Sequence, residues 1–591
     1  MTAFILPQRD ENEKIETREK KTIFTKIMNI RDWTFSYFGE CVMVKEIRKG
    51  FWADAYKVQI KKAGVSMAKV AVYDGDNIHW YSCKEGELLS DVLKREGYLL
   101  AMPCAGKGIC GKCRIKARGQ LSEMREEESR FLSEEEKNEG IRLACMARVL
   151  GNVRVEYEGK RKTQGSVQEE GIERKVVLDP SSQGWGAAVD IGTTTMAAYL
   201  YRLSDGKRTA QTSDSNPQSP WGADVISRIE RALAGEGKIL STVVIQKLEK
   251  MILSMLSEGG KRAEDLQEMV ITANTAMLYL LTKTDPEELS HAPFHASRRF
   301  GEWIPAESLG FQKFPAARAY LPRCASAFVG ADITTAMVAS GMLEEKSPSL
   351  LLDIGTNGEI ALCKDGKLIC CSTAAGPALE GGNIRMGMPA LPGAIDMVSY
   401  SEKGFSYTTI GGQTPMGLCG SGLLDATAAL RKSGILDDTG AIQEEEHTWI
   451  SSLCEVEGFP AFRFPNSQVV LTQRDIRNVQ LAKGAICAGI RTLLSHAGLQ
   501  PEDIGTFYLA GGFGSYINIQ SAVEIGLIPQ AFLNKTKVAG NAAGMGACML
   551  LQSQTLRRES EAMTDRMETV ELSQNPLFQQ YYMDSMMLEP I

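Results

Sequence analysis

The chain has 591 residues, a formal net charge of −7 and 43% hydrophobic residues. This length suits roughly two to four domains with a large buried core. The negative charge argues against a general nucleic-acid binder, and no apolar run is long enough to predict a transmembrane helix. Because the first residues are too highly charged for a secretory signal, we expect a cytoplasmic protein.

Residues 1–66 show no pattern that predicts a domain. The segment MAKVAVYDGD, which begins at Met67, is a natural start for a small β domain. We therefore expect residues 1–66 to be an N-terminal extension, either disordered or the product of a misplaced start site.

Residues 67–158 have the pattern of a β-grasp domain. Two β-rich segments, 68–73 and 78–83, flank a turn, and residues 86–96 have the apolar spacing of a helix. Further strands are expected at 114–119 and 153–157. Between the helix and the third strand lies a glycine-rich loop that contains most of the clustered cysteines.

Four of the 14 cysteines form a set with the spacing C-x5-C-x2-C-x31-C: Cys104, Cys110, Cys113 and Cys145. Glycines in the loop allow backbone N–H groups to point at the sulfurs of an iron–sulfur cluster. The plant-type [2Fe–2S] pattern has four residues in its first gap, whereas this chain has five. Zinc is the alternative, although zinc sites usually have two C-x2-C pairs. The segment resembles the adrenodoxin-like branch of the [2Fe–2S] ferredoxins.

Polar residues 159–185 are expected to be a linker. After them one pattern occurs twice: an apolar strand ends in Asp-Ile-Gly-Thr, and a second strand and an Asp-Gly turn follow. The two aspartates, Asp190 and Asp353, are 163 residues apart. This repeat predicts two similar α/β lobes that face each other.

The repeated motif suits the phosphates of a nucleotide. Glycine turns present N–H groups to phosphate oxygens, hydroxyl groups add donors, and the aspartates can hold Mg²⁺ through water. The candidate ATP-binding residues are Gly192, Thr193, Thr194, Thr195, Gly355, Thr356 and Asn357. Asp190 and Asp353 are the candidate catalytic acids, and Glu359 is a candidate for orienting water, with a structural role left open.

A third glycine turn, Gly511, Gly512 and Gly514, ends an apolar strand near the C-terminus. Together with the two hairpins it resembles the actin/sugar kinase/Hsp70 (ASKHA) ATPases, where such a turn contacts adenosine. The resemblance implies an α+β ferredoxin followed by a two-lobed, RNase H-like α/β ATPase. Residues 186–349 would form lobe 1, 350–555 would form lobe 2 and complete lobe 1, and 556–591 would be a tail.

The fusion resembles the ATP-dependent reductive activators of corrinoid proteins. Four further segments match that family: NPQSPWGADVISRI, VITANTAMLYLL, STAAGPALEGGNIRMGM and CGSGLLD. The resemblance implies one-electron reduction of Co(II) to Co(I) for a corrinoid-dependent methyltransferase system, such as one for O-demethylation, in an anaerobe. It also implies a corrinoid protein as partner and a low-potential ferredoxin or flavodoxin as electron donor, and it leaves a homodimer open. The alternatives are an activator like those of 2-hydroxyacyl-CoA dehydratases, or a redox-sensing ATPase.

Three residues in the matching segments are candidates for contact with the partner: Ser372, Thr373 and Arg385. Asp224 and Arg228 are four residues apart in an expected helix, which predicts a structural ion pair. A role for them near the nucleotide is the alternative.

Overall fold

The computed structural model describes residues 67–74, 77–96, 98, 108, 111, 113–157, 172, 174–179, 183–222, 224–402, 404–443 and 452–591. The expected extension 1–66 and the cluster cysteines Cys104 and Cys110 lie outside these residues. No helix in the described part of the chain is long and apolar enough to cross a membrane.

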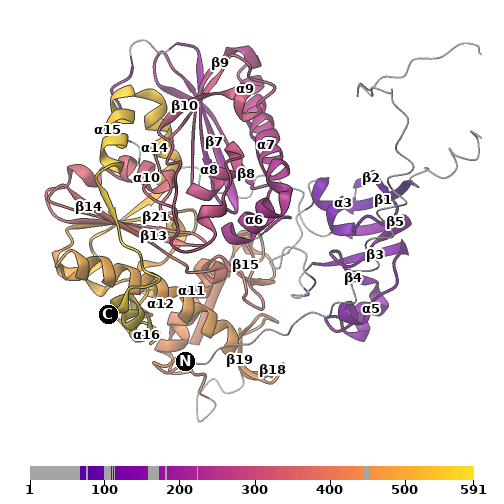
Figure 1. Ribbon diagram of the computed structural model, residues 1–591. Coiled ribbons are helices and arrows are strands. Elements are labelled where there is room, and N and C mark those ends of the chain that lie inside the picture. The colour runs from indigo at the N-terminus through magenta and orange to yellow at the C-terminus, as the bar shows by residue number, and fades with distance from the viewer. Residues whose placement is uncertain are drawn as a thin grey trace, which may run out of the picture. The chain divides into compact units, whose positions relative to one another are not determined.

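The first described segment is a five-stranded sheet with the order β2-β1-β5-β3-β4 (Figure 1). Helix α3 packs on one face, where Leu89, Val92 and Leu93 join the buried residues of the strands. The predicted hairpin is confirmed, because Asp74 pairs with Asn77 at its turn. The elements are β1 (Met67–Asp74), β2 (Asn77–Lys84), α3 (Leu89–Arg95), β3 (Arg114–Leu121), α4 (Glu126–Ser129), α5 (Glu134–Glu139), β4 (Ile141–Leu143) and β5 (Val149–Tyr157).

Two six-stranded sheets follow, one for each copy of the repeated motif. The first has the order β10-β11-β9-β6-β7-β8 and consists of β6 (Trp185–Ile191), β7 (Thr195–Arg202), β8 (Lys207–Ser215), β9 (Leu266–Ala273), β10 (Glu302–Pro305) and β11 (Arg318–Leu321). The second has the order β22-β21-β12-β13-β14-β23 and consists of β12 (Ser349–Ile354), β13 (Gly358–Lys364), β14 (Lys367–Thr373), β21 (Thr506–Ala510), β22 (Thr536–Gly540) and β23 (Met567–Thr569).

The two sheets share one topology. In each, three antiparallel strands carry the motif, and a later strand pairs in parallel with the first of them: β9 with β6, and β21 with β12. A further parallel strand, β11 or β22, lies beside that one. The internal repeat read from the sequence is therefore a structural repeat.

Two helices, α10 (Ala331–Ser340) and α14 (Ala542–Gln552), lie in one apolar core with residues of both six-stranded sheets. They cross closely at Gly546, where an added Cβ would lie 2.0 Å from the carbonyl oxygen of Thr335. Small residues such as Ala336, Ala339 and Ala547 complete this buried contact. The pair thus joins lobe 1 to lobe 2.

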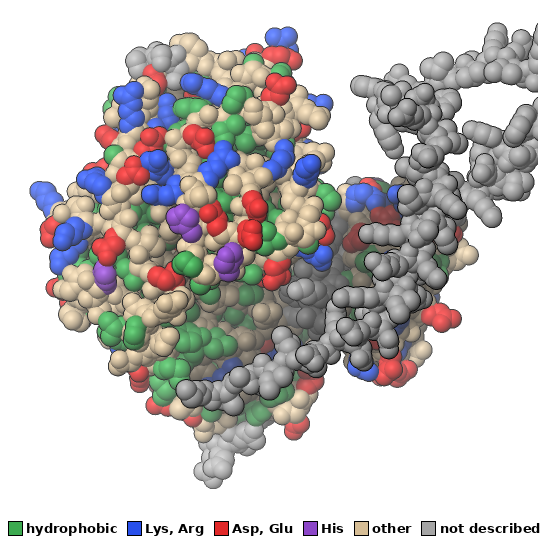
Figure 2. Space-filling model, viewed as in Figure 1, with side chains coloured by type: hydrophobic (Ala, Val, Ile, Leu, Met, Phe, Trp, Pro, Cys, Tyr) green, Lys and Arg blue, Asp and Glu red, His purple; other side chains and the backbone are tan. Residues whose placement is uncertain are grey.

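The outer faces of the two sheets are covered by separate sets of helices (Figure 1). Lobe 1 has α6 (Val225–Arg231), a π-helical turn (Ala232–Glu236), α7 (Gly237–Glu258), α8 (Thr275–Thr282) and α9 (Ala306–Leu309). Lobe 2 has α11 (Gly420–Lys432), α12 (Gln473–His496) and α13 (Ile519–Glu524), with small sheets of β15 (Ala394–Ser401), β16 (Gly404–Thr409) and β17 (Gly417–Leu418), and of β18 (Leu453–Val456), β19 (Phe459–Arg463) and β20 (Val470–Thr472). Acidic and basic side chains are interspersed over the face of the lobes seen in Figure 2.

The segment 556–591, which the sequence predicts to be a C-terminal tail, packs against lobe 2. After α15 (Gln554–Thr564), β23 joins the edge of the lobe 2 sheet, and α16 (Pro576–Asp584) packs against α12. Leu588 is fully buried, and the buried Lys483 of α12 donates to the Met587 carbonyl. Burial lowers the pKa of this lysine to about 8.

Candidate functional site

The two described cysteines of the cluster motif lie side by side. Cys113 precedes β3 and Cys145 follows β4, and these strands pair at Arg114 and Leu143. Their sulfur atoms are 3.2 Å apart, which is too far for a disulfide bond. Both side chains are buried, and the Cys145 N–H donates to the Cys113 sulfur at 3.5 Å.

This pair has the chemistry of metal ligands. The hydrogen bond with Cys113 lowers the pKa of Cys145 to about 7, helped by the N–H groups of Gly108 and Cys145 and opposed by burial. A thiol with a lowered pKa readily supplies the thiolate that iron requires. Gly111 has φ +62°, and an added Cβ would lie 2.6 Å from the Phe131 ring, so the loop requires glycine there. These residues fit an iron–sulfur cluster.

The first phosphate loop runs from Asp190, near the end of β6, to the start of β7 at Thr195. Thr194 and Thr195 are exposed, while Gly192 and Thr193 are half-buried. Asn216 donates to the Gly192 carbonyl at 2.8 Å, and its own N–H donates to the Thr194 carbonyl at 2.8 Å. Asn216 therefore holds the main chain of the loop, and the Thr193 hydroxyl accepts from Asn274 at 3.4 Å, while Thr194 and Thr195 stay exposed.

Arg228 also supports this loop. Its fully buried guanidinium donates to the carbonyl of Thr193 at 2.6 Å, to that of Gly222 at 3.0 Å and to Gln218 at 3.2 Å. Asp224 instead caps α6 by accepting from the Ser227 N–H at 2.8 Å. The predicted ion pair of Asp224 with Arg228 is not among the contacts of the described residues, because Asp224 caps the helix and Arg228 donates to two carbonyls and to Gln218.

The second phosphate loop follows β12. Asp353 and Glu359 are directly opposite each other on β12 and β13, and Thr356 donates to Glu380 at 3.1 Å. Asn357 forms a side-chain hydrogen bond with Glu359. Gly355 is half-buried, and a Cβ added to it would lie no closer than 3.9 Å to any neighbouring atom. The loop therefore has room for a ligand.

The third glycine turn touches the second loop. Gly511 has φ +94°, and an added Cβ would lie 2.5 Å from the Ile354 carbonyl and 2.6 Å from the Asp353 carboxylate. Gly512 faces open space, and Gly514 lies against Leu509. Two segments that are far apart in the sequence thus meet at Asp353.

Sequence reasoning missed Asp332, on the first turn of α10. Burial and then the charge of Asp332 are the two largest causes that raise the pKa of Asp190 to about 7 and of Asp353 to about 8. The same two causes raise the pKa of Glu359 well above its ordinary range, and burial raises that of Asp332 to about 6. Asp332 therefore lies between the two loops. The signal in the sequence is an Asp two residues after a glycine, at the start of an apolar helix.

Asn541, at the start of α14, was also missed. Its amide nitrogen donates to Tyr199 at 3.2 Å, its oxygen accepts from the Gly544 N–H at 2.8 Å, and it forms a hydrogen bond with Asp190. Each of the two helices between the lobes thus contributes a side chain to the site.

Five acids lie in this site: Asp190, Asp332, Asp353, Glu359 and Glu380. Among the described residues, no lysine or arginine forms an ion pair with any of them. In the same part of the chain, no three His, Cys, Asp or Glu side chains converge as a preformed metal site. A cation that is bound largely through water, with a nucleotide, suits such a set of acids.

The candidate partner residues do not form one surface. Ser372 donates to Glu359 at 3.3 Å, so it belongs to the acidic site. Thr373 is only 2% exposed and donates to the Gly358 carbonyl, so its side chain offers no surface to a partner. Arg385 lies elsewhere, with its side chain 2.6 Å from Glu457.

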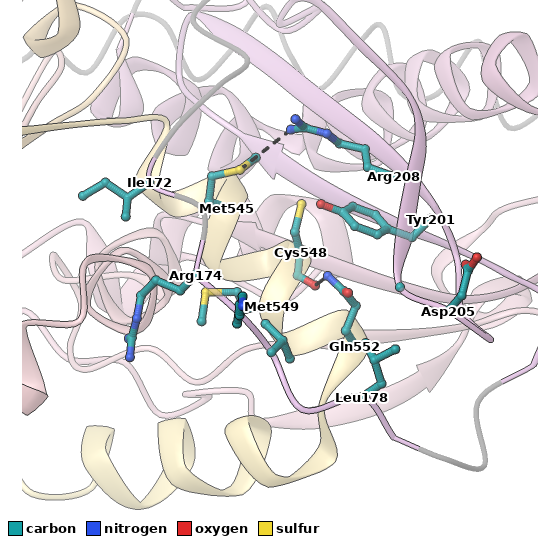
Figure 3. Close-up of a pocket in the computed structure, with 13 residues that line it drawn as sticks. Ile172, Arg174, Leu178, Tyr201, Asp205, Arg208, Met545, Cys548, Met549 and Gln552 are labelled. Carbon is teal, nitrogen blue, oxygen red and sulfur yellow. Dashed lines mark hydrogen bonds between the residues drawn. The ribbon is translucent and has the colours of Figure 1, made fainter.

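A cavity of about 550 Å³ lies away from the phosphate loops (Figure 3). The described end of the expected linker, with Ile172, Arg174 and Leu178, forms one wall, and the β7–β8 turn and α14 form the others. Arg208 and Met545 point toward each other across it. None of the predicted site residues lines this cavity.

Comparisons with known proteins agree with this arrangement. Residues 74–150 match the family described as 2Fe-2S iron-sulfur cluster binding domain, 185–345 match the RACo middle region, and 347–590 match the C-terminal domain of RACo, the ASKHA domain. These matches assign an iron–sulfur cluster and ATP to the chain.

Among similar proteins is the corrinoid activation enzyme RamQ of Eubacterium limosum, which is 31% identical over 68% of this chain and 69% of the relative. The [Co(II) methylated amine-specific corrinoid protein] reductase of Methanosarcina barkeri is 25% identical over 58% of this chain and 66% of the relative. The solved structure of a reductive activator for corrinoid,iron-sulfur protein is 27% identical, with a TM-score of 0.64 over 88% of this chain and 98% of that chain. The chain therefore belongs to the RACo family of reductive activators of corrinoid proteins.

Proposed function

We propose that the protein uses ATP to drive the one-electron reduction of a corrinoid protein from inactive Co(II) to Co(I). The observation that carries this proposal is the presence of two sites in one chain. One is the thiol pair of Cys113 and Cys145, in which the pKa of Cys145 is lowered. The other is the set of carboxylates without cationic partners between the repeated hairpins.

The need for ATP follows from redox energetics. Co(I) corrinoids are stronger reductants than an ordinary [2Fe–2S] centre, so the electron must move uphill. For one electron about 59 mV corresponds to 1.4 kcal/mol, so a gap of a few hundred millivolts costs about 5–10 kcal/mol. Binding and hydrolysis of ATP can supply this by shifting the equilibrium between two conformations of the complex.

At the ATPase site we assign roles to the predicted residues. Asp190 and Asp353 would hold Mg²⁺, and the threonines and glycines of the two loops would bind the phosphates. Glu359 would orient the attacking water. Asp332, which lies between both loops, keeps the pKa values of these acids high until the metal–nucleotide complex offsets their repulsion.

At the redox site we assign all four cysteines, Cys104, Cys110, Cys113 and Cys145, as cluster ligands. When bound, a [2Fe–2S] cluster supplies the transfer of single electrons. The backbone N–H groups that lower the pKa of Cys145 would stabilise its thiolate in the ligand set. The electron donor would be a low-potential ferredoxin or flavodoxin.

The domain boundaries proposed from the sequence, after residues 66, 158, 185, 349 and 555, stay predictions.

The test follows Co(I) formation by its absorption band. The anaerobic reaction contains a reductant, Mg²⁺, ATP and a Co(II) corrinoid protein. We expect the wild-type protein to form Co(I) only with ATP, and Asp353→Asn to lose both ATP hydrolysis and Co(I) formation. Glu502→Gln, which changes an exposed acid on the same lobe, is the matched control and should retain both activities.

Two outcomes would contradict the proposal. Equal Co(I) formation without ATP would show that the electron transfer needs no coupling. Loss of ATP hydrolysis in Asp353→Asn with normal Co(I) formation would show that the two sites work independently.

A further inference from the structure

The β-grasp sheet has one face that the described part of the chain leaves open to solvent. Along β5, buried and exposed residues alternate over most of the strand, and the buried ones join α3 in the core. The opposite side, which we name the outer face, consists of Lys69, Tyr73, Ile78, Trp80, Lys116, Arg118, Arg154 and Glu156.

Large apolar side chains are exposed on this outer face. Trp80 is 64% exposed and Ile78 is 50% exposed, both on the edge strand β2. Tyr73 pairs with Ile78, and the Arg154 guanidinium stacks over the Tyr73 ring at 3.9 Å. Trp, Tyr and Arg are the residues that most often dominate the binding energy of protein interfaces. This composition favours a protein partner.

The charges of the outer face specify the kind of partner. Four basic side chains lie on it, and Glu156 is the one acid in the set, 2.9 Å from Lys116 and 3.5 Å from Arg154, so one carboxylate faces four cations. Arg118 and Arg154 are directly opposite each other on β3 and β5. Like charges in this position repel, and an acidic partner would offset their repulsion. The complementary partner is therefore acidic.

The outer face is also close to the redox site. Lys116 of β3 is three residues after Cys113, which lies just before this strand, and three residues of extended chain span roughly 10 Å. Arg118 and Arg154 lie beyond it on the same part of the sheet. A protein bound here would thus bring its own redox centre near the cluster ligands.

We propose that the outer face is the docking surface for an acidic one-electron carrier protein that reduces the cluster. The reduced carrier gives up one electron, the cluster gains it, and no covalent bond forms or breaks. This inference rests on the proposed reductive function, but it concerns the electron input and neither ATP nor the corrinoid protein.

The experiment measures binding of a purified acidic 2[4Fe–4S] ferredoxin, in its oxidised form, to the full-length holoprotein at low and moderate salt. We expect Trp80→Ser and Arg118→Glu each to raise the Kd by about tenfold or more, and wild-type binding to weaken as salt rises. Arg130→Glu is the matched control, because this exposed arginine lies between α4 and α5, outside the outer face. Its Kd should stay within about twofold of wild type.

A second readout is the rate of cluster reduction by the same ferredoxin in its reduced form. Reduction of each variant by dithionite, which needs no docking, checks that the cluster is intact. If Trp80→Ser fails to assemble its cluster, Arg118→Glu decides alone. The proposal is overturned if wild type does not bind the ferredoxin at low salt, or if both variants bind it as wild type does. Either result would leave ATP-dependent Co(I) formation untouched.

Discussion

Asp353→Asn should stabilise the nucleotide-free protein at neutral pH, although it removes a residue of the ATPase site. Burial, and then the charges of Asp332, Asp190 and Glu380, raise the pKa of Asp353 from 3.8 to about 8. The folded protein therefore binds a proton that the unfolded chain releases. The stability that this proton contributes is complete below about pH 4 and is lost as the pH rises through about 8.

The magnitude follows from this shift. One pKa unit corresponds to 1.36 kcal/mol, so taking up the proton at pH 7 costs about 4 kcal/mol if Asp353 acts alone. The side chain is half-buried and the neighbouring acids share the repulsion, so we expect a gain of about 1–3 kcal/mol. Since asparagine has the same shape without the charge, this gain corresponds to a rise in Tm of roughly 1–4 °C for two lobes of about 400 residues.

The assay is thermal unfolding of the full-length protein with EDTA and without nucleotide, at pH 5, 7 and 8. The gain of Asp353→Asn should be larger at pH 8 than at pH 5, where less energy is needed to protonate the wild-type acid. Glu502→Gln, which changes an exposed acid, should shift the Tm by less than about 0.5 °C at each pH. A gain that does not depend on pH, or a loss of stability at pH 8, would refute the electrostatic reasoning.

Three further predictions concern other parts of the molecule. Cys145→Ser should lose the iron and the visible absorption of the cluster but retain ATP hydrolysis; a normal EPR signal after reduction would argue against its role as a ligand. Arg228→Gln should raise the KM for ATP about tenfold, because the Thr193 carbonyl loses its buried donor, whereas Arg231→Gln on the exposed side of the same helix should not. Leu588→Ala should lower the free energy of unfolding by about 2–4 kcal/mol in urea titrations, and an unchanged midpoint would mean that the C-terminal segment does not stabilise lobe 2.

The elements with local signals could be predicted from the sequence. The hairpin at Asp74 and Asn77 and the two motif hairpins rest on alternation, turn residues and repetition, which are properties of neighbouring residues. Asp332 and Asn541 could not be found in this way. Each begins a helix between the lobes, and its nearness to Asp190 depends on how distant segments pack.

The same reasoning explains two other differences. Asp224 and Arg228 have the right spacing for an ion pair. However, Asp224 caps its own helix, and Arg228 donates to the carbonyl of Thr193, which is 35 residues away in the sequence. In the C-terminal segment, the apolar residues Leu572 and Leu588 are too isolated to form a periodic pattern. Their burial depends on a surface that lobe 2 provides.

The placement of α14 and β23 has a consequence for dissecting the protein. Helix α14 packs against β6 and β9 of lobe 1, although the chain reaches it only after most of lobe 2, and then returns to lobe 2 with β23. Tyr199 and Val270 lie in the core that both lobes share. In a fragment such as residues 185–345, these side chains would lose the contacts that α14 makes and would be partly exposed to solvent. Neither half is a self-sufficient folding unit, so fragments should aggregate when expressed separately and regain solubility when co-expressed.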